Sequence, residues 1–300
     1  MGVRAHPAPS RFGRFSSSDE SVGKVSECPG KGDDEEMNRR QFLSAGAAAA
    51  ITPILPGIAP AQTTATAGDP LPPVGADGWI QLFNGRDLTG WYTFFPSLGK
   101  DKDPKGFVKV ENGMLHLMGN EVTGENVEQG YMATNHVFSN CRFRAEFKWG
   151  VKRFPPHEEA KRDNGLLYYV NGPDKVWPAC VEFQGQESDL GDAYLLGGTR
   201  RKMGGVSAVA GPPMPTPATN HIVKAGDFEN RNDWNVIECV TRGDRATHIV
   251  NGRIVVNLTN LTQPDPQNPG QLIPLTSGKL AVEIQWAEIW YRRIEVKFFG

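Results

Sequence analysis

Short runs in which apolar and polar residues alternate fill the chain from Trp79 onward, and this period of two predicts β-strands. Turn residues separate the runs, and Asn-Gly, a strong signal for a tight hairpin, occurs five times. No segment after residue 61 keeps the 3.6-residue apolar period of a helix, which argues against alternating strands and helices. The longest expected strands are Cys141–Trp149, Leu166–Val170, Ala179–Gln184, Trp234–Thr241, Lys279–Trp286 and Ile289–Phe298.

The number and spacing of these runs limit the fold class. About a dozen strands with turns between them favour a sandwich, a jelly roll or a barrel. The absence of an internal repeat of fixed period argues against a propeller. Two long stretches rich in proline, Val209–Asn220 and Leu261–Pro274, are expected to be loops at the rim of a functional site.

Alternation also assigns side chains to the two faces of each strand. In Cys141–Trp149 the odd-numbered residues are apolar, whereas the even-numbered ones are charged. Glu182 and Gln184 share the polar face of their strand, and Glu283 and Gln285 share that of another. Such a face is either the floor of a cleft for a polar ligand such as a sugar, or simply the wet outer surface of a sheet. Aromatic residues and an acidic loop next to Glu182 favour the cleft.

The N-terminal residues lack the pattern of a folded domain. Residues 1–36 show no periodicity, and we interpret them as a disordered segment or an extension upstream of a true start at Met37. Residues 37–61 combine a charged start, a short apolar stretch and a small-residue cleavage site, which is typical of an export signal. Residues 62–76 are interpreted as a linker, which leaves residues 77–300 as one domain.

The paired Arg39-Arg40 before Phe42-Leu43 resembles a twin-arginine (Tat) signal. This resemblance implies that the twin-arginine translocation machinery is a partner and that the mature protein is periplasmic or secreted. The alternatives are an N-terminal membrane anchor and a buried helix. The apolar stretch Ala45–Ile58 contains two prolines and is shorter than the about 20 residues of a membrane span, so we expect no stable span.

Composition excludes further classes of protein. The chain contains 32 Lys and Arg residues against 34 Asp and Glu residues, so its charge does not fit a basic nucleic-acid binder. Four cysteines in 300 residues are too few for a disulfide scaffold. A Tat substrate folds before export, so Cys141, Cys180 and Cys239 need not form disulfides.

Five segments carry a resemblance to one family and occur in the family's order: Gly78–Trp91, Asp163–Tyr168, Val181–Gln184, Trp234–Gly252 and Gly278–Lys297. The first, with Leu82-Phe83-Asn84-Gly85 and Gly90-Trp91, is the most specific. Together they resemble the 3-keto-disaccharide hydrolase domain family over about residues 77–298. The resemblance implies an all-β fold, a concanavalin-A-like jelly-roll β-sandwich of two antiparallel sheets.

The resemblance also implies an enzyme, a hydrolase or lyase that acts on a glycoside oxidised at C3 of the sugar. The C3 ketone acidifies the C2 proton, so a base can remove that proton and the group at C1 then leaves by β-elimination. Addition of water gives net hydrolysis. This chemistry needs a base with a tuned pKa and an electropositive group at the developing oxyanion.

The polar faces supply the candidate residues for these roles. As catalytic residues we expect Glu182 (base or metal ligand), Glu146 (second carboxylate) and Lys148 (oxyanion stabilisation). As substrate-binding residues we expect Asn164, Gln184, Gln285, Tyr168 and Arg144, the last also as an alternative to Lys148.

A divalent metal such as Ca²⁺ on the ketone oxygen would serve as an electrophile. The candidate ligands are Glu182, Glu187, Asp189 and Asp192, although the acidic loop lacks an EF-hand pattern and is also compatible with simple solvation. No motif for an organic cofactor is present, and the sequence has neither His-x-x-x-His nor Cys-x-x-Cys.

Two other functions stay open at this point. The first is a non-catalytic, lectin-like carbohydrate-binding module, because one fold hosts both activities. The second is a retaining glucanase, which would need two carboxylates on one strand, whereas Gln184 follows Glu182 at the second position.

Overall fold

β-Strands account for all regular secondary structure in the part of the chain that the computed structural model describes, residues 70–119, 127–201 and 220–299. These residues all fall in one compact unit, Ile58–Gly300. The predicted all-β class is therefore confirmed. The predicted extension, export signal and most of the linker lie outside the described residues, as does nearly all of Val209–Asn220.

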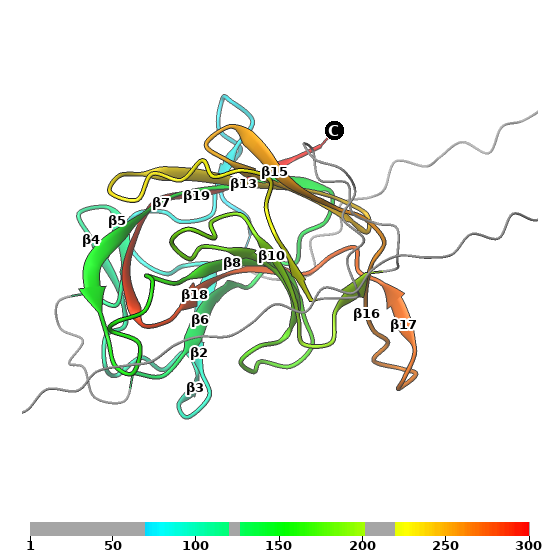
Figure 1. Ribbon diagram of the computed structural model, residues 1–300, viewed down its shortest axis with the longest axis horizontal. Helices are drawn as coiled ribbons and strands as arrows, with labels where there is room; N and C mark the ends of the chain where they lie inside the picture. The colour runs from blue at the N-terminus through cyan, green and yellow to red at the C-terminus, as the bar shows by residue number, and fades with distance from the viewer. Residues whose placement is uncertain (1–69, 120–126, 202–219, 300) are drawn as a thin grey trace, which may run out of the picture. The chain divides into compact units, whose positions relative to one another are not determined.

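The strands form two large antiparallel sheets and one small one, and the large sheets stack as two layers in Figure 1. Sheet A contains, in spatial order, β15 (Arg253–Leu258), β14 (Arg245–Val250), β13 (Asn235–Arg242), β7 (Cys141–Arg153), β19 (Ala287–Phe298), β5 (Met114–Leu117) and β4 (Val108–Glu111), with β1 (Ile80–Gln81) beside β19. Sheet B contains β12 (His221–Ile222), β10 (Ala193–Leu196), β9 (Ala179–Gln184), β8 (Gly165–Asn171), β18 (Lys279–Ile284), β6 (Gly130–Thr134), β2 (Trp91–Phe95) and β3 (Gly99–Lys100).

The third sheet corrects one prediction. Leu261–Pro274 is not a loop throughout, because it contains β16 (Leu261–Pro264) and β17 (Leu272–Pro274), which pair with each other and with β11 (Arg200–Arg201). Each proline lies at the last position of its strand in a sheet of three strands, where a missing amide donor is tolerated.

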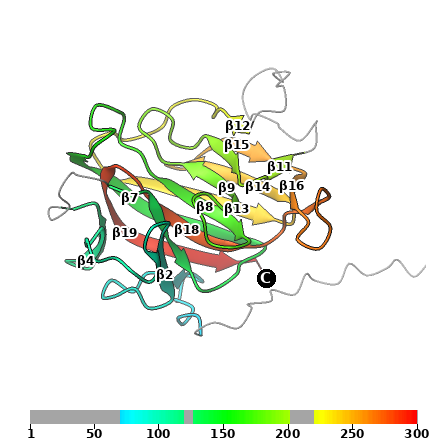
Figure 2. The same ribbon diagram turned by 90° about the horizontal axis from the view of Figure 1, so that it is seen from below.

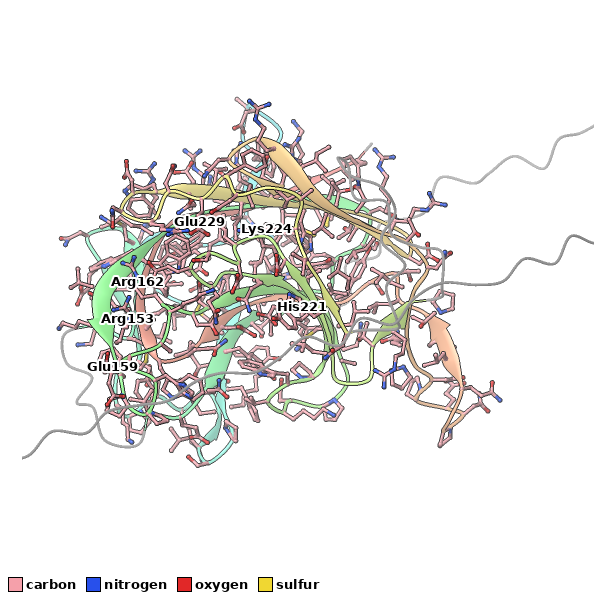
Figure 3. The ribbon with its side chains drawn as sticks, in the orientation of Figure 1. Arg153, Glu159, Arg162, His221, Lys224 and Glu229 are labelled. Carbon is pink, nitrogen blue, oxygen red and sulfur yellow. The ribbon has the colours of Figure 1, made fainter. Side chains whose placement is uncertain are left out.

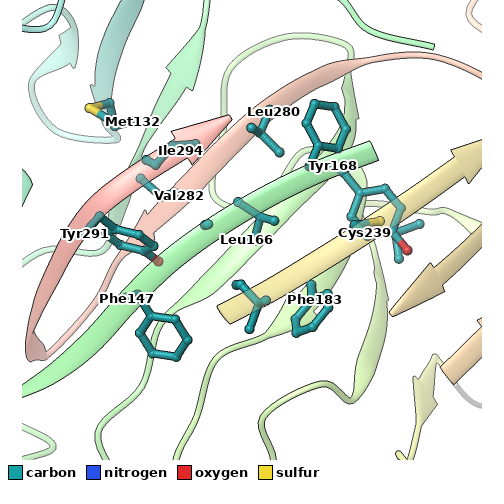
Figure 4. Close-up of a cluster of buried hydrophobic side chains, with 14 of the residues drawn as sticks. Met132, Phe147, Leu166, Tyr168, Phe183, Cys239, Leu280, Val282, Tyr291 and Ile294 are labelled. Carbon is teal, nitrogen blue, oxygen red and sulfur yellow. The ribbon is translucent and has the colours of Figure 1, made fainter. Parts of the chain in front are cut away.

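The inner faces of sheets A and B share one apolar core. Figure 4 shows part of this core in close-up, with Phe147 of β7 and Tyr291 of β19 near Leu166, Phe183 and Val282 of sheet B. The odd-numbered residues of β7 from Cys141 to Trp149 are buried in this core, as the alternation predicted, whereas Val151 beyond them is exposed. Figure 2 shows the strands of the two sheets along a common diagonal, the aligned packing of a sandwich. The polar residues that alternate with these core residues in β7 and β9 are consequently directed to the outer faces.

Sheet B is joined to sheet A at β18 and β19 by only two residues, Gln285 and Trp286. The start of β19 is anchored by Glu288, whose carboxylate accepts hydrogen bonds from the backbone amides of Val151 at 2.9 Å and Lys152 at 3.2 Å. The Nε2 atom of His116 lies 2.9 Å from the same carboxylate.

His116 itself is fully enclosed. Its Nδ1 atom lies 2.9 Å from Glu111, and its ring stacks on Trp290 at 3.4 Å. Because both ring nitrogens face carboxylates, a protonated imidazole can donate a hydrogen bond to each of them. Burial raises the pKa of Glu288, but the hydrogen bonds from His116 and from the two amides outweigh it, and the net shift is downward. His116 therefore holds together the end of β7 and the β18–β19 connection.

We predict that His116→Leu lowers the free energy of unfolding by about 3 kcal/mol, because the buried carboxylate of Glu288 loses its hydrogen-bond partner on β5. Glu111→Gln is the control, since the Glu111 side chain is 40% exposed and its loss costs less than about 1 kcal/mol. Denaturant unfolding at pH 6 measures both values. Equal losses for the two variants would contradict this assignment.

Candidate functional site

Two glutamates meet on the outer face of sheet B, one on each side of β8. Glu182 belongs to β9 and Glu283 to β18, and both strands pair with β8. Gly165 of β8 lies between them, where a Cβ atom would be 2.7 Å from Glu283 Oε2 and 2.9 Å from Glu182 Oε1. Glycine therefore provides the space that the two carboxyl groups share.

Burial makes both carboxyl groups reluctant to ionise. Glu182 is 6% exposed and Glu283 is 1% exposed. Burial, with a smaller contribution from the charge of Asp163, raises the pKa of Glu182 to about 8. Burial, together with the charges of Glu182 and Asp163, raises the pKa of Glu283 well above its ordinary value. The pair consequently holds a proton at neutral pH. Because the two groups interact, each titration step is a property of the pair and not of one glutamate.

Asp163, two residues before the start of β8, adds a third carboxyl group beside the pair. Burial raises its pKa to about 6. Its Oδ2 atom accepts a hydrogen bond from Gln186 Nε2 at 3.0 Å, whereas its buried Oδ1 atom has no hydrogen-bond partner among the described residues. A buried acceptor without a partner is available to a ligand or a water molecule.

Amide side chains border the carboxyl groups, and two of them were predicted as site residues. Gln285 donates a hydrogen bond from Nε2 to Glu283 at 2.6 Å and accepts one from Gln129 at 3.0 Å. Gln184 accepts a hydrogen bond from the backbone amide of Gln186 at 2.9 Å. The structure thus brings Glu182, Gln184 and Gln285 together on one face.

Aromatic side chains flank the carboxyl pair on this face. Tyr194 of β10 is the cross-strand partner of Glu182, and Tyr131 of β6 is that of Glu283. The Tyr131 hydroxyl donates a hydrogen bond to Asp174 at 2.6 Å, and its ring lies 6.5 Å from that of Trp177. Carboxyl, amide and aromatic groups on one sheet face are the combination that polar ligands such as sugars use.

Two predicted substrate-binding residues instead face the core. Tyr168 is fully buried, and its hydroxyl lies 2.8 Å from His248 Nε2. Asn164 is 1% exposed and donates a hydrogen bond to the hydroxyl of Tyr291 at 2.5 Å. Both therefore lie on the side of β8 opposite to the carboxyl pair and do not form part of the site.

Three further predicted residues, Glu146, Lys148 and Arg144, lie on β7 and therefore on the outer face of sheet A. Glu146 forms ion pairs with Arg292 and Arg293 at 2.5 and 3.2 Å. The other two are engaged with partners of the same sheet face, since Arg144 pairs with Glu295 and the Lys148 ammonium lies 5.3 Å from the Trp234 ring centroid. The core separates this face from Glu182.

The acidic loop after β9 does not converge on one point. Asp189 pairs with Lys161 at 2.9 Å, and Asp192 lies 2.7 Å from His221 Nε2. Glu187 pairs with Arg162 at 2.5 Å and with Arg153 at 3.3 Å, and this hydrogen-bonded pairing lowers the pKa of Glu187 to about 2.

Figure 3 shows that the partners of these acidic residues lie apart, with Arg153 and Arg162 near β7 and His221 at β12. Within residues 70–119, 127–201 and 220–299, no group of three or more Asp, Glu, His or Cys residues is arranged to hold a metal ion. The predicted ligands Glu182, Glu187, Asp189 and Asp192 thus do not fit a shared metal site.

Glu283 and Asp163 are the site residues that sequence reasoning missed. Alternation along Lys279–Trp286 already placed Glu283 beside Gln285 as the only carboxylate on that face. That signal could have identified it. For Asp163 the sequence offered only its position before Asn164-Gly165, which does not reveal burial.

The described cysteines, Cys141, Cys180 and Cys239, are all free and buried. None of the described residues lies in a helix that is long and apolar enough to cross a membrane.

Comparison with known proteins gives one match at the level of sequence families. Residues 78–297 match the model of a family described as the 3-keto-alpha-glucoside-1,2-lyase-like domain. None of the curated proteins matches the chain.

Among solved structures, the chain is similar to a provisionally assigned glycosyl hydrolase from Parabacteroides distasonis, with 19% identity, a TM-score of 0.47, and coverage of 75% of this chain and 95% of the other. It is also similar to a protein of unknown function with a galectin-like fold from Bacillus subtilis (12% identity, TM-score 0.42, coverage 73% and 94%). A third similar structure is a carbohydrate-binding module from Bacillus subtilis (10% identity, TM-score 0.38, coverage 69% and 95%).

The raised pKa of Glu182 predicts a specific pH dependence of stability. A carboxyl group whose pKa rises from 4.5 to about 8 on folding favours the folded state below pH 4.5 and loses this contribution as the pH rises towards 8. Glu182→Gln removes this titration, so the melting temperature of the variant should exceed that of the wild type by a margin that grows from pH 5 to pH 9. Thermal unfolding across this range measures the margin.

Glu187→Gln serves as the control with the opposite sign. Its pKa is lowered to about 2, so its stabilising contribution is present above pH 4.5 and the variant should be less stable than the wild type there. A Glu182→Gln margin that stays constant with pH would show that Glu182 has no raised pKa.

Proposed function

Since the chain belongs to the 3-keto-alpha-glucoside-1,2-lyase-like domain family, we propose that it is an exported carbohydrate-active enzyme that cleaves the glycosidic bond of 3-keto-glycosides. The observation that carries this proposal is the buried pair Glu182 and Glu283 on the outer face of sheet B, with raised pKa values. Perturbed carboxyl groups of this kind cluster at sites where protons are transferred.

Glu182 acts as the general base in this proposal. A base with a pKa near 8 accepts a proton more readily than an ordinary glutamate does, and it is still ionised in part of the molecules at neutral pH. The C2 proton of a 3-keto-glycoside is acidified by the neighbouring ketone. Transfer of this proton to Glu182 leaves an enolate whose negative charge is centred on the C3 oxygen.

Glu283 acts as the acid that faces this oxygen. Because its pKa lies well above the ordinary value, Glu283 stays protonated and can donate a hydrogen bond to the developing oxyanion. Gln285 holds the Glu283 carboxyl group by its hydrogen bond of 2.6 Å. Two carboxyl groups with different protonation states thus divide the roles of base and acid.

Elimination completes the cleavage. The enolate expels the oxygen at C1 and leaves a double bond between C1 and C2. Addition of water to C1 returns the proton to C2 and gives the free 3-keto sugar, so the same site serves as a lyase or, after hydration, as a hydrolase.

We predict that the mature protein cleaves a 3-keto-disaccharide and leaves the unoxidised parent disaccharide intact. Glu182→Gln should lower kcat by about 10²-fold or more, because it removes the base, while the sugar still binds. Product analysis after incubation measures cleavage, and calorimetric titration measures binding. Matched incubations with and without a chelator report whether a metal contributes.

Glu146→Gln is the matched control, because Glu146 lies on the outer face of the other sheet and should not affect turnover. The wild-type kcat/KM should rise with pH and level off above about 8, as Glu182 ionises. Binding of a 3-keto-glycoside without any turnover would favour a carbohydrate-binding module over an enzyme.

Export is a separate part of the proposal and rests on the N-terminal sequence. We predict that Arg39→Lys together with Arg40→Lys retains the full-length precursor in the cytoplasm, because the paired arginines are what the translocation machinery reads. Fractionation of cells and mass determination of the exported protein test this, and the wild type should begin at Gln62. Unchanged export of the double variant would rule out the twin-arginine route.

A further inference from the structure

Three side chains form a row next to the carboxyl pair. Tyr194 of β10 is the cross-strand partner of Glu182 on one side and of His221 on the other. Directly opposed residues of antiparallel strands project from the same face, and neighbouring strands lie about 4.8 Å apart. Tyr194 therefore stands immediately beside the residue that we propose as the base.

The hydroxyl of Tyr194 differs from those of the other five tyrosines of the chain. Each of the five has a hydrogen-bonded hydroxyl: Tyr92 and Tyr131 with Asp174, Tyr168 with His248, Tyr169 with the Gly243 carbonyl, and Tyr291 with Asn164. The partly exposed Tyr194 has no hydrogen-bond partner for its hydroxyl among the residues that the structure describes. Its donor is therefore available to a ligand on this face.

The ring of Tyr194 is nevertheless held in place. It stacks on His221 with ring centroids 4.1 Å apart and planes inclined by 5°. His221 Nε2 lies 2.7 Å from Asp192, which is 3% exposed and also accepts a hydrogen bond from the Lys224 amide at 2.9 Å. This chain of contacts fixes the direction of the Tyr194 side chain without occupying its hydroxyl.

We propose that Tyr194 is the general acid that donates its phenolic proton to the glycosidic oxygen as the C1–O bond breaks. This role rests on the proposed function. The C2 proton passes to Glu182, the electron pair of the C1–O bond leaves on the oxygen, and the Tyr194 proton binds there. The water that adds to C1 restores the tyrosine proton, so protons and electrons balance.

Two features suit Tyr194 to this role. The C2 proton and the glycosidic oxygen are on adjacent carbon atoms of the sugar, so groups on adjacent strands can reach both. Burial and then the charges of Asp192 and Glu182 raise the pKa of Tyr194, so it stays protonated until an alkoxide of higher basicity forms beside it.

The test is Tyr194→Phe, assayed on 3-keto-glucosides whose leaving groups differ in basicity. A poor leaving group such as methanol or a second sugar requires protonation, so its kcat should fall about 10²-fold. 4-Nitrophenol leaves without help, so its kcat should change by less than about threefold, and KM should be unchanged for both. Tyr169→Phe is the matched control, because this hydroxyl bonds to a backbone carbonyl away from the site.

Each other outcome would overturn the role. Equal losses for both leaving groups, with thermal unfolding unchanged, would make Tyr194 a positioning residue and not the acid. No loss for the poor leaving group would exclude a role in proton transfer. An inactive wild type would overturn the proposed function and this role with it. If the wild type is active, the Tyr194→Phe result tests the role of Tyr194 alone.

Discussion

The shared core of the two sheets is the constraint on which the rest of the domain depends. A strand in either sheet can direct only every second side chain into this core, so the side chains between them project from an outer face. Glu182 and Gln184 project outward because Val181 and Phe183 project inward. The same rule applies to Glu283 on β18, where Val282 and Ile284 occupy the core. The chemistry of the outer face is thus fixed by packing on the inner one.

Placing two carboxyl groups close together in a buried position lowers the stability of the fold through electrostatics. Two like charges in a poorly solvated position repel each other, and each also loses hydration. The pair avoids most of this cost by keeping a proton, as the raised pKa values indicate. The remaining cost is offset by the apolar core, which does not depend on the protonation state of the outer face. The proton that the pair retains in the folded state is therefore also available for transfer to a bound ligand.

The alternation of apolar and polar residues predicts which face of a strand a side chain occupies, but not which sheet contains the strand. It placed Glu182, Gln184 and Gln285 on an outer face correctly, and the motifs of the opening segment identified the family. It could not say to which sheet a strand belongs, so Glu146 on β7 was grouped with Glu182 although the core lies between them. It also failed where β8 departs from regular pleating. The register shifts after Tyr168, and Tyr169 has a φ of 55°, so both tyrosines are buried in the core.

The two-residue connection between β18 and β19 has a consequence for how the protein responds to change. Glu283 lies near the end of β18 in sheet B. Glu288 lies near the start of β19 in sheet A, where its carboxylate contacts His116. Because two residues separate β18 from β19, the position of Glu283 on one sheet constrains the position of Glu288 on the other. Selection for a more rigid fold and selection for a different arrangement of the carboxyl pair would therefore act on the same few residues. β9 and β10, which carry Glu182 and Tyr194, are separated from β18 by β8 and are not part of this joint.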